Sequence, residues 1–150
     1  NGASPRASGA RLRCRRPGLG LGQPLTVFGT DFPTRDGTAI RDYVHVRDLA
    51  DAHALALEAL QGGEGSIGAF NLGTRDGATV REVIETVEHV TGKSVPVRYA
   101  ERRPGDPPVL IADSTRAREV LGWEPRRSTL EEMVASAWQW FQRHPDGYLD

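Results

Sequence analysis

Apolar residues recur along the chain with two kinds of spacing, which divide it into expected helices and strands. Spacings of three and four residues place side chains on one face of a helix, and they occur in four segments. The helices are expected at 49–60, 80–90, 117–121 and 130–141. Short apolar or alternating runs predict β-strands at 25–28, 38–47, 69–73, 95–100 and 109–112. Strands that alternate with helices predict an α/β fold.

The segment 38–52 is expected to run from a strand directly into a helix. The pleat of a strand places alternate residues on one face, here Arg41, Tyr43, His45 and Arg47. Such a face is typical either of a binding surface or of a solvated strand edge, and the spacing alone leaves both open. Asp48 stands where a helix N-cap is expected, because its carboxylate can accept the free N–H groups of the first turn.

Other helix ends also have recognisable signals. In a capping box, a Thr and a Glu three residues later each accept a hydrogen bond from the other's backbone N–H. This pattern occurs at Thr79 with Glu82 and at Thr129 with Glu132. Gly92 is expected to end its helix in the left-handed conformation, and Ser114 is expected to cap the short helix.

The composition is that of one soluble globular domain. The chain has 150 residues, of which 38% are hydrophobic and 26% charged, and its net charge is −1. No apolar run approaches the roughly 20 residues of a membrane-spanning helix. Cys14 has no partner for an intrachain disulfide. We therefore expect a cytoplasmic protein that makes no contact with a membrane.

Residues 1–23 differ from the rest of the chain. They are rich in Gly, Ala, Ser, Pro and Arg and lack any helical or strand period, so they cannot bury enough apolar surface to offset the entropy of ordering. We interpret them as a disordered or aberrant arm. Their glycine run does not fit a dinucleotide-binding loop, because Gln23 stands at the third glycine position and no strand precedes it. The five arginines of the arm leave open a non-catalytic basic module that binds nucleic acid.

The loop at 101–108 is the best candidate for chemistry. The four histidines lack the spacing of a zinc site, and no serine lies in a G-x-S-x-G motif, so we predict no metal-binding and no catalytic residues. Arg102 and Arg103 could clamp a diphosphate through charge-assisted hydrogen bonds. Asp106 could accept hydrogen bonds from sugar hydroxyls. A salt-bridged surface turn is the alternative that these residues alone leave open.

Several motifs follow one another in a specific order. They are L-T-V-F-G-T-D-F-P-T-R-D-G-T at 25–38, R-D-Y-V-H-V-R-D-L-A at 41–50, F-N-L-G at 70–73, R-R-P-G-D at 102–106, W-Q-W at 138–140 and H-P-D-G-Y at 144–148. In this order and spacing, residues 24–150 resemble the C-terminal half of the UDP-glucose 4-epimerase family, which belongs to the extended short-chain dehydrogenases/reductases. The resemblance implies the last strands of a Rossmann-like sheet together with a small α/β substrate domain.

The resemblance also implies a site for the UDP part of UDP-galactose and UDP-glucose. The implied substrate-binding residues are Thr26, Val27, Phe28, Arg41, Arg103, Asp106 and Leu110. The backbone of the first three and the Phe28 ring would hold the uracil, the two arginines would bind the diphosphate, and the aspartate would bind the ribose. Leu110 would line the sugar pocket. Family members often carry Tyr or Cys at that position, so the preference between hexoses and N-acetylhexosamines stays open.

The family's reaction implies groups beyond this site. NAD oxidises the sugar C4 hydroxyl transiently, and a Tyr-x-x-x-Lys pair serves as the base; the intact enzyme is expected to be a homodimer. Lys93 is the only lysine of this chain, and His89 stands four positions before it. We therefore expect the 150 residues to be catalytically incomplete and to supply the substrate-binding half of an isomerase. The alternative is a fragment of another nucleotide-sugar dehydratase or decarboxylase.

Overall fold

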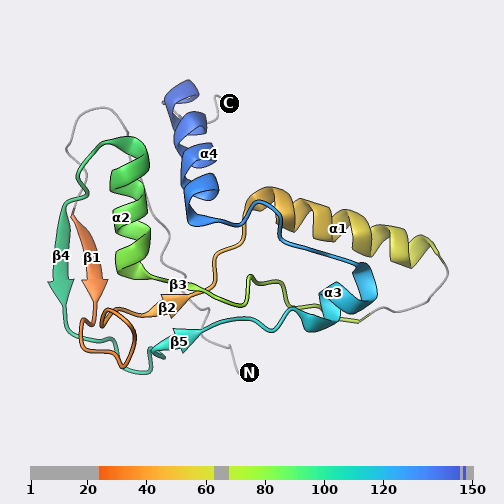
Figure 1. Cartoon of the computed structure of the whole chain (residues 1–150), viewed down its shortest axis with the longest axis horizontal. Helices are drawn as coiled ribbons and strands as arrows, with labels where there is room; N and C mark the ends of the chain where they lie inside the picture. Colours follow the sequence, from red (N-terminus) through yellow and green to blue (C-terminus); the bar gives the residue numbers. More distant parts are fainter. Residues whose placement is uncertain (1–23, 63–67, 146, 148–150) are drawn as a thin grey trace, which may run out of the picture.

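The computed structural model describes residues 24–62, 68–145 and 147, and the arm expected at 1–23 lies outside the described residues. In chain order the elements are β1 (Leu25–Phe28), β2 (Ile40–Arg41), α1 (Val46–Gln61), β3 (Ala78–Thr79), α2 (Val80–Thr91), β4 (Val97–Ala100), β5 (Val109–Leu110), α3 (Thr115–Leu121) and α4 (Leu130–Arg143). Short strands that alternate with helices confirm the predicted α/β fold. In Figure 1, β1, β4 and α2 lie at one end of the molecule, and α1 and α3 lie at the other.

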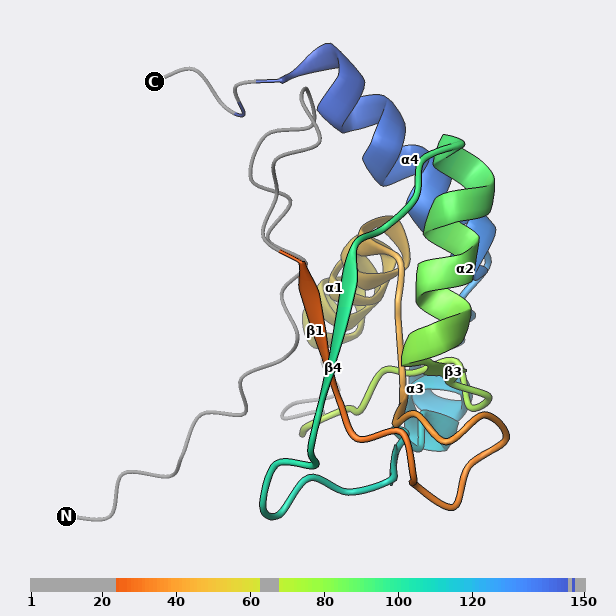
Figure 2. The ribbon, with the colours of Figure 1, turned by 90° about the vertical axis from the view of Figure 1, so that its left-hand side faces the viewer.

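Two small sheets organise the chain. β1 and β4 pair in parallel, whereas β2 lies between β3, its antiparallel partner, and β5, its parallel partner. Figure 2 shows β1 and β4 side by side with α2 to one side of them, and in Figure 1 α4 follows α2 on the side away from these strands. The loops from β1 to β2 and from β4 to β5 therefore run together. Their ends are joined by hydrogen bonds of 2.8 Å from Gly29 N–H to Ala100 O and from Ile40 N–H to Pro108 O.

The strand expected at 38–47 is much shorter than predicted. β2 ends at Arg41, and α1 begins at Val46 with His45 as its N-cap. The Nδ1 atom of His45 accepts the N–H of Arg47 at 3.0 Å. The prediction that Asp48 caps this helix is therefore wrong, as is the common face predicted for Arg41, Tyr43, His45 and Arg47.

Asp48 is fully buried one turn further along, where it joins α1 to the segment before α4. Its Oδ2 accepts the N–H of Arg127 at 2.9 Å and the hydroxyl of Ser128 at 2.6 Å. These partners lie about eighty positions away in the chain. This distant pairing explains why the local cap pattern failed at Asp48.

The strand expected at 69–73 does not form, since no strand in the described part of the chain pairs with it. Instead a side chain holds the segment's end, because Asp42 Oδ1 accepts the backbone N–H of Thr74 at 2.9 Å and its hydroxyl at 2.7 Å. The same carboxylate accepts the N–H of Ala112 at 3.1 Å, just past the point where β5 ends. β5 is thus shorter than the run predicted at 109–112.

The helix ends predicted at Thr79 and Gly92 are confirmed, whereas those predicted at Thr129 and Ser114 are confirmed only in part. The capping box of Thr79 and Glu82 is complete at the start of α2, and Gly92 ends this helix with a φ of 66°. At α4, Thr129 accepts the N–H of Glu132 at 3.2 Å, while the Glu132 carboxylate lies 3.7 Å from Arg127. Ser114 precedes α3 but makes no side-chain cap bond, because its hydroxyl donates to Gly73 O at 3.0 Å.

The main apolar core joins α1 to α3. It consists of Ala52, Ala117, Leu121 and Trp123, with partly buried neighbours such as Phe70 and Leu72. Trp123 is fully buried, and its indole N–H donates to Asp48 O at 2.8 Å. None of the helices described has the length and apolarity that crossing a bilayer requires.

The loop between β1 and β2 is fixed to the start of α2 by Asp36. Its Oδ1 accepts both the N–H of Thr38 at 2.8 Å and the Thr38 hydroxyl at 2.7 Å. Its Oδ2 accepts the Thr79 hydroxyl at 2.5 Å. Thr38 and Thr79 are both buried, so their hydroxyls depend on this carboxylate. Beside it, Arg35 forms an ion pair with Glu82.

Substitution of Asp36 is expected to destabilise the fold. Asp36→Ala removes the acceptor for three donors, two of them hydroxyls of buried residues, and should lower the free energy of unfolding by about 1–3 kcal/mol. Asp36→Asn keeps one acceptor oxygen and should cost less. The measurement is urea denaturation followed by circular dichroism.

Asp51→Ala serves as the matched control, because Asp51 is exposed on α1 and its substitution should change stability by less than about 0.5 kcal/mol. Equal stability of Asp36→Ala and Asp51→Ala would show that the loop does not depend on the carboxylate.

Candidate functional site

Two arginines share one carboxylate near the ends of the two sheets. Arg41 Nη2 lies 2.5 Å from Asp106 Oδ1, and Arg103 Nη2 lies 2.9 Å from Asp106 Oδ2. Each carboxylate oxygen therefore receives one guanidinium group. We call Arg41, Asp106 and Arg103 the Arg–Asp–Arg cluster. The predicted diphosphate and ribose residues are thus brought together although 65 positions separate Arg41 from Asp106.

Strand pairing brings the cluster together. Arg41 ends β2, while Arg103 and Asp106 lie in the loop from β4 to β5, which crosses the end of β2 because β5 pairs with it. Asp106 N–H donates to Arg103 O at 3.2 Å, and Gly105 between them has a φ of 77°, so this part of the loop is a tight turn. Arg41 Nη1 also donates to Pro107 O at 3.0 Å, which fixes its guanidinium against the same loop.

Phe28 extends the cluster toward β1. The guanidinium carbon of Arg103 lies 4.9 Å from the centroid of the Phe28 ring, within the range of a cation–π contact. The ring is 38% exposed. The groups between the end of β1 and the end of β2 therefore follow in a fixed order: an accessible aromatic surface, a guanidinium and a carboxylate.

β1 offers free backbone groups along one edge. Leu25 N–H and Gly29 N–H donate to carbonyls of the β4 side at 2.8 Å. Because backbone groups alternate in direction along a strand, those of Thr26 and Phe28 point away from β4. In the part of the chain described, β1 has no second strand partner. The Val27 side chain is buried at 2% exposure, so Val27 does not present its side chain to a ligand.

The remaining predicted residues lie around this line. Leu110 is 57% exposed and stands opposite Arg41 in the β2–β5 register, so both side chains project from the same face. The structure separates Arg102 from Arg103. Arg102 forms an ion pair with Asp31 at 2.6 Å and lies over the Phe32 ring at 4.3 Å. The structure therefore does not bring Arg102 and Arg103 together as a pair, and Arg103 lies instead with Arg41 at Asp106.

The other residues of the motif at 41–50 face elsewhere. His45 is buried, and its Nε2 lies 3.0 Å from the hydroxyl of Ser136 on α4. Burial raises the pKa of Tyr43, and the charge of Arg41 partly opposes that rise.

Arg98 was not identified from the sequence, yet its guanidinium reaches the Thr26 hydroxyl at 3.3 Å. Only the parallel register of β1 and β4 could have indicated this contact.

The cluster holds its carboxylate in the charged form. Burial acts to raise the pKa of Asp106, but the Arg103 hydrogen bond and the charges of Arg41 and Arg103 outweigh it, so that pKa lies below its ordinary value. Both arginines are partly neutralised in turn. The three side chains thus form a connected set of ion pairs.

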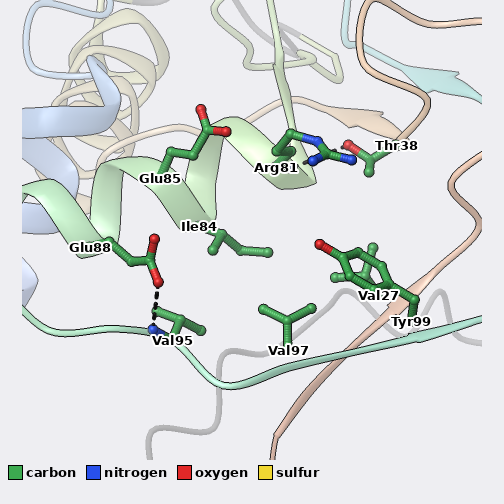
Figure 3. A pocket seen from close by; sticks show the side chains of 9 residues that line it. All are labelled: Val27, Thr38, Arg81, Ile84, Glu85, Glu88, Val95, Val97 and Tyr99. Atoms are coloured by element: carbon green, nitrogen blue, oxygen red, sulfur yellow. Dashed lines mark hydrogen bonds between the residues drawn. The ribbon is translucent and has the colours of Figure 1, made fainter.

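The cavity drawn in Figure 3 is a separate feature. It measures about 190 Å³ and lies between α2 and the β1–β4 pair. Its lining residues are Val27, Thr38, Arg81, Ile84, Glu85, Glu88, Val95, Val97 and Tyr99. Val27 is the one predicted site residue among them, and it contributes an apolar wall. An open hollow beside Gly29, Asp31 and Arg102 lies on the other side of Phe28 in the chain from Val27. No acidic, histidine or cysteine group able to hold a metal ion occurs among the described residues.

Comparisons with known proteins agree with the sequence resemblance. A family model described as GDP-mannose 4,6 dehydratase matches residues 19–137. The UDP-glucose 4-epimerase of Halalkalibacterium halodurans is 51% identical over 130 residues, which make up 87% of this chain and 39% of that protein. The chain thus spans about two fifths of the length of this curated relative, and the matches lie in the C-terminal region of the relatives.

Solved structures give the same result. A crystal structure of a UDP-glucose 4-epimerase superposes with a TM-score of 0.82 at 43% identity and covers 86% of this chain and 39% of that one. The enzyme of Stenotrophomonas maltophila, solved with NAD and formylated UDP-arabinopyranose, has a TM-score of 0.76 at 45% identity and covers 83% and 36%. The chain therefore has the fold of one region of these larger proteins.

Removal of Arg103 is expected to raise the pKa of Asp106. The pKa of Asp106 in the folded chain should lie below about 3.9, the ordinary value, and Arg103→Gln should move it upward because a hydrogen bond and a charge are lost. Since the folded-state pKa is lower than the unfolded-state one, the cluster stabilises the fold above about pH 4. That stabilisation is lost as the pH falls through the folded-state value.

The measurement is an NMR titration of the carboxyl carbon of Asp106. Arg47→Gln is the matched control, because Arg47 is exposed on α1 outside the cluster. A pKa of Asp106 that is the same in both variants would contradict the arrangement.

Proposed function

We propose that this chain, which belongs to the GDP-mannose 4,6 dehydratase family, is the substrate-binding part of a UDP-glucose 4-epimerase. The observation that carries the proposal is the continuous line of Phe28, Arg103, Asp106 and Arg41 beside the open edge of β1. This line offers, in order, a surface for a base, a carboxylate for a ribose and two guanidinium groups for a diphosphate.

The uracil would bind at β1. Uracil has one N–H donor flanked by carbonyl acceptors, which matches the outward backbone groups of Thr26 and Phe28. The exposed Phe28 ring would pack against the base, as aromatic side chains do with nucleobases. Val27 would contribute backbone shape only, since its side chain is buried.

The diphosphate and ribose would bind at the Arg–Asp–Arg cluster. Arg41 and Arg103 approach from two different elements, so they can reach different oxygens of a diphosphate. Asp106 would accept hydrogen bonds from ribose hydroxyls. Leu110 is open on the Arg41 face of the sheet and would border the sugar beyond the diphosphate.

NAD would supply the removal and return of hydride at the sugar C4 atom. The residues described here do not fit its pyrophosphate, because at each of the three long helices a side chain already accepts a hydrogen bond at the N-terminus. His45 accepts at α1, Thr79 and Glu82 cap α2, and Thr129 accepts at α4. No strand–helix connection in the described part has the G-x-G-x-x-G turn. The proposed task of this chain is therefore to hold the substrate, and the intact enzyme would work as a homodimer.

Loss of either arginine is expected to weaken UDP binding. Arg41→Gln and Arg103→Gln each remove a charged hydrogen-bond donor, which should cost about 1.5–3 kcal/mol, or about 10- to 100-fold in Kd. Isothermal titration of the 150-residue chain with UDP measures this. Arg47→Gln should bind UDP with the same Kd as the unchanged chain. An equal Kd for all three variants would contradict the proposed role of Arg41 and Arg103.

The same titration distinguishes the proposed epimerase from a second candidate function, that of a dehydratase. The family description favours a dehydratase that acts on another nucleotide sugar, whereas the relatives compared above are UDP-glucose 4-epimerases. A pocket built for uracil should bind UDP more tightly than dTDP, because the thymine methyl has no place in it. Tighter binding of dTDP or GDP would support the dehydratase.

The 150-residue chain is expected to show no epimerase activity by itself. It contains neither a Tyr-x-x-x-Lys pair nor, in its described part, a site for the NAD pyrophosphate. NMR of a mixture with UDP-galactose and NAD should therefore show no UDP-glucose, with the enzyme of Halalkalibacterium halodurans as positive control. Conversion by a preparation free of host epimerase would overturn the proposed division of tasks.

A further inference from the structure

We propose that Asp106 makes this site selective for nucleoside diphosphates over bare anions, because it occupies both arginines until a ribose takes over its hydrogen bonds. This inference rests on the proposed function and adds a selectivity mechanism to it. Both carboxylate oxygens are engaged, one by Arg41 at 2.5 Å and one by Arg103 at 2.9 Å. Arg41 and Arg103 therefore each direct one charged donor at Asp106, and these two donors reach an anion only when Asp106 is displaced.

A bare diphosphate meets two costs at this site. To use the two donors that Asp106 engages, it must break both ion pairs, and it leaves a negative carboxylate without those donors close to its own charge. The Asp106 side chain is only 15% exposed, so water replaces the lost donors poorly. Removal of donors from a partly buried charged group is more costly than the mean value of a hydrogen bond suggests.

A nucleoside diphosphate lowers the second of these costs. Its ribose carries vicinal hydroxyl groups, and two O–H donors can replace the two N–H donors that Asp106 loses. The arginines are then released to the diphosphate while the carboxylate remains hydrogen-bonded. Pyrophosphate has no such donors, so the penalty falls selectively on bare anions.

The arginines have other anchors that remain when Asp106 changes partner. Arg41 Nη1 donates to Pro107 O at 3.0 Å and to Ile40 O at 2.7 Å. Arg103 lies 4.9 Å from the Phe28 ring centroid. Both guanidinium groups therefore stay near the site when Asp106 changes partner. The role of Asp106 is to neutralise their charge and not to position them.

The first test compares pyrophosphate and UDP binding by the chain and by Asp106→Asn, using isothermal titration at fixed ionic strength. The variant removes one charge next to both arginines, so pyrophosphate should bind about tenfold more tightly. UDP should gain nothing, because one of the two oxygens that would accept from the ribose hydroxyls becomes an amide donor. The preference for UDP over pyrophosphate should therefore fall at least tenfold.

Asp113→Asn is the matched control, since it makes the same charge change at an exposed position beside α3. It should leave the preference for UDP unchanged. Pyrophosphate binding that is no tighter in Asp106→Asn than in Asp113→Asn, while the unchanged chain prefers UDP, would overturn the inference. A chain that never prefers UDP to pyrophosphate would instead overturn the proposed function.

The second test needs no variant of the protein, so it stands even if Asp106→Asn does not fold. Uridine at saturation should occupy Asp106 and release the arginines, which should tighten pyrophosphate binding severalfold. Dideoxyuridine, which lacks both ribose hydroxyls, should have no such effect. Equal effects of the two nucleosides would overturn the inference.

Discussion

The structure depends on aspartate carboxylates, whose hydrogen bonds hold segments together where the strands are too short to do so. β2, β3 and β5 are two residues long, and ladders of this length cannot fix the loops that leave them. Asp36, Asp42 and Asp48 follow at intervals of six residues, and each accepts hydrogen bonds from a different distant segment. Asp36 holds the start of α2, Asp42 holds the segments after Gly73 and Ile111, and Asp48 holds the approach to α4. The path from β1 to α1 is thereby joined to nearly every later element.

This arrangement explains why the site forms at the end of β2. Arg41 lies between a residue paired in both directions, Ile40, and the fixed carboxylate of Asp42. Its backbone therefore has little freedom, and its long side chain extends from a rigid base. The partner loop is held at one end by the Gly29–Ala100 hydrogen bond and at the other by the Ile40–Pro108 hydrogen bond. Arg103 and Asp106 thus meet Arg41 because strand pairing brings both loop ends to it.

Features with local causes could be predicted from the sequence, and features with distant causes could not. The capping box at Thr79 and the stop at Gly92 need only neighbours in the chain, and both were predicted. The cap of α1 was assigned to Asp48, because the competing partners Arg127 and Ser128 are invisible to a local pattern. The segment at 69–73 has the composition of a strand but finds no strand to pair with in the described chain. The gathering of Arg41, Arg103 and Asp106 was implied only by the family resemblance, whereas the separation of Arg102 needed the structure.

The way the helices begin also constrains how this fold can bind an anion. Free N–H groups at a helix N-terminus are a common anion site, but in the three long helices described here side chains already accept at that end. At α2 the accepting group is itself a carboxylate, which would repel a phosphate. Under the proposed function, an anion would therefore bind to arginine side chains, which carry a permanent charge. A charge of that kind attracts any small anion unless a neighbouring group neutralises it, and Asp106 is the group in contact with both arginines. The proposed binding of an anion by guanidinium groups and the pairing of those groups with Asp106 therefore have the same cause: side chains already accept hydrogen bonds at the helix N-termini.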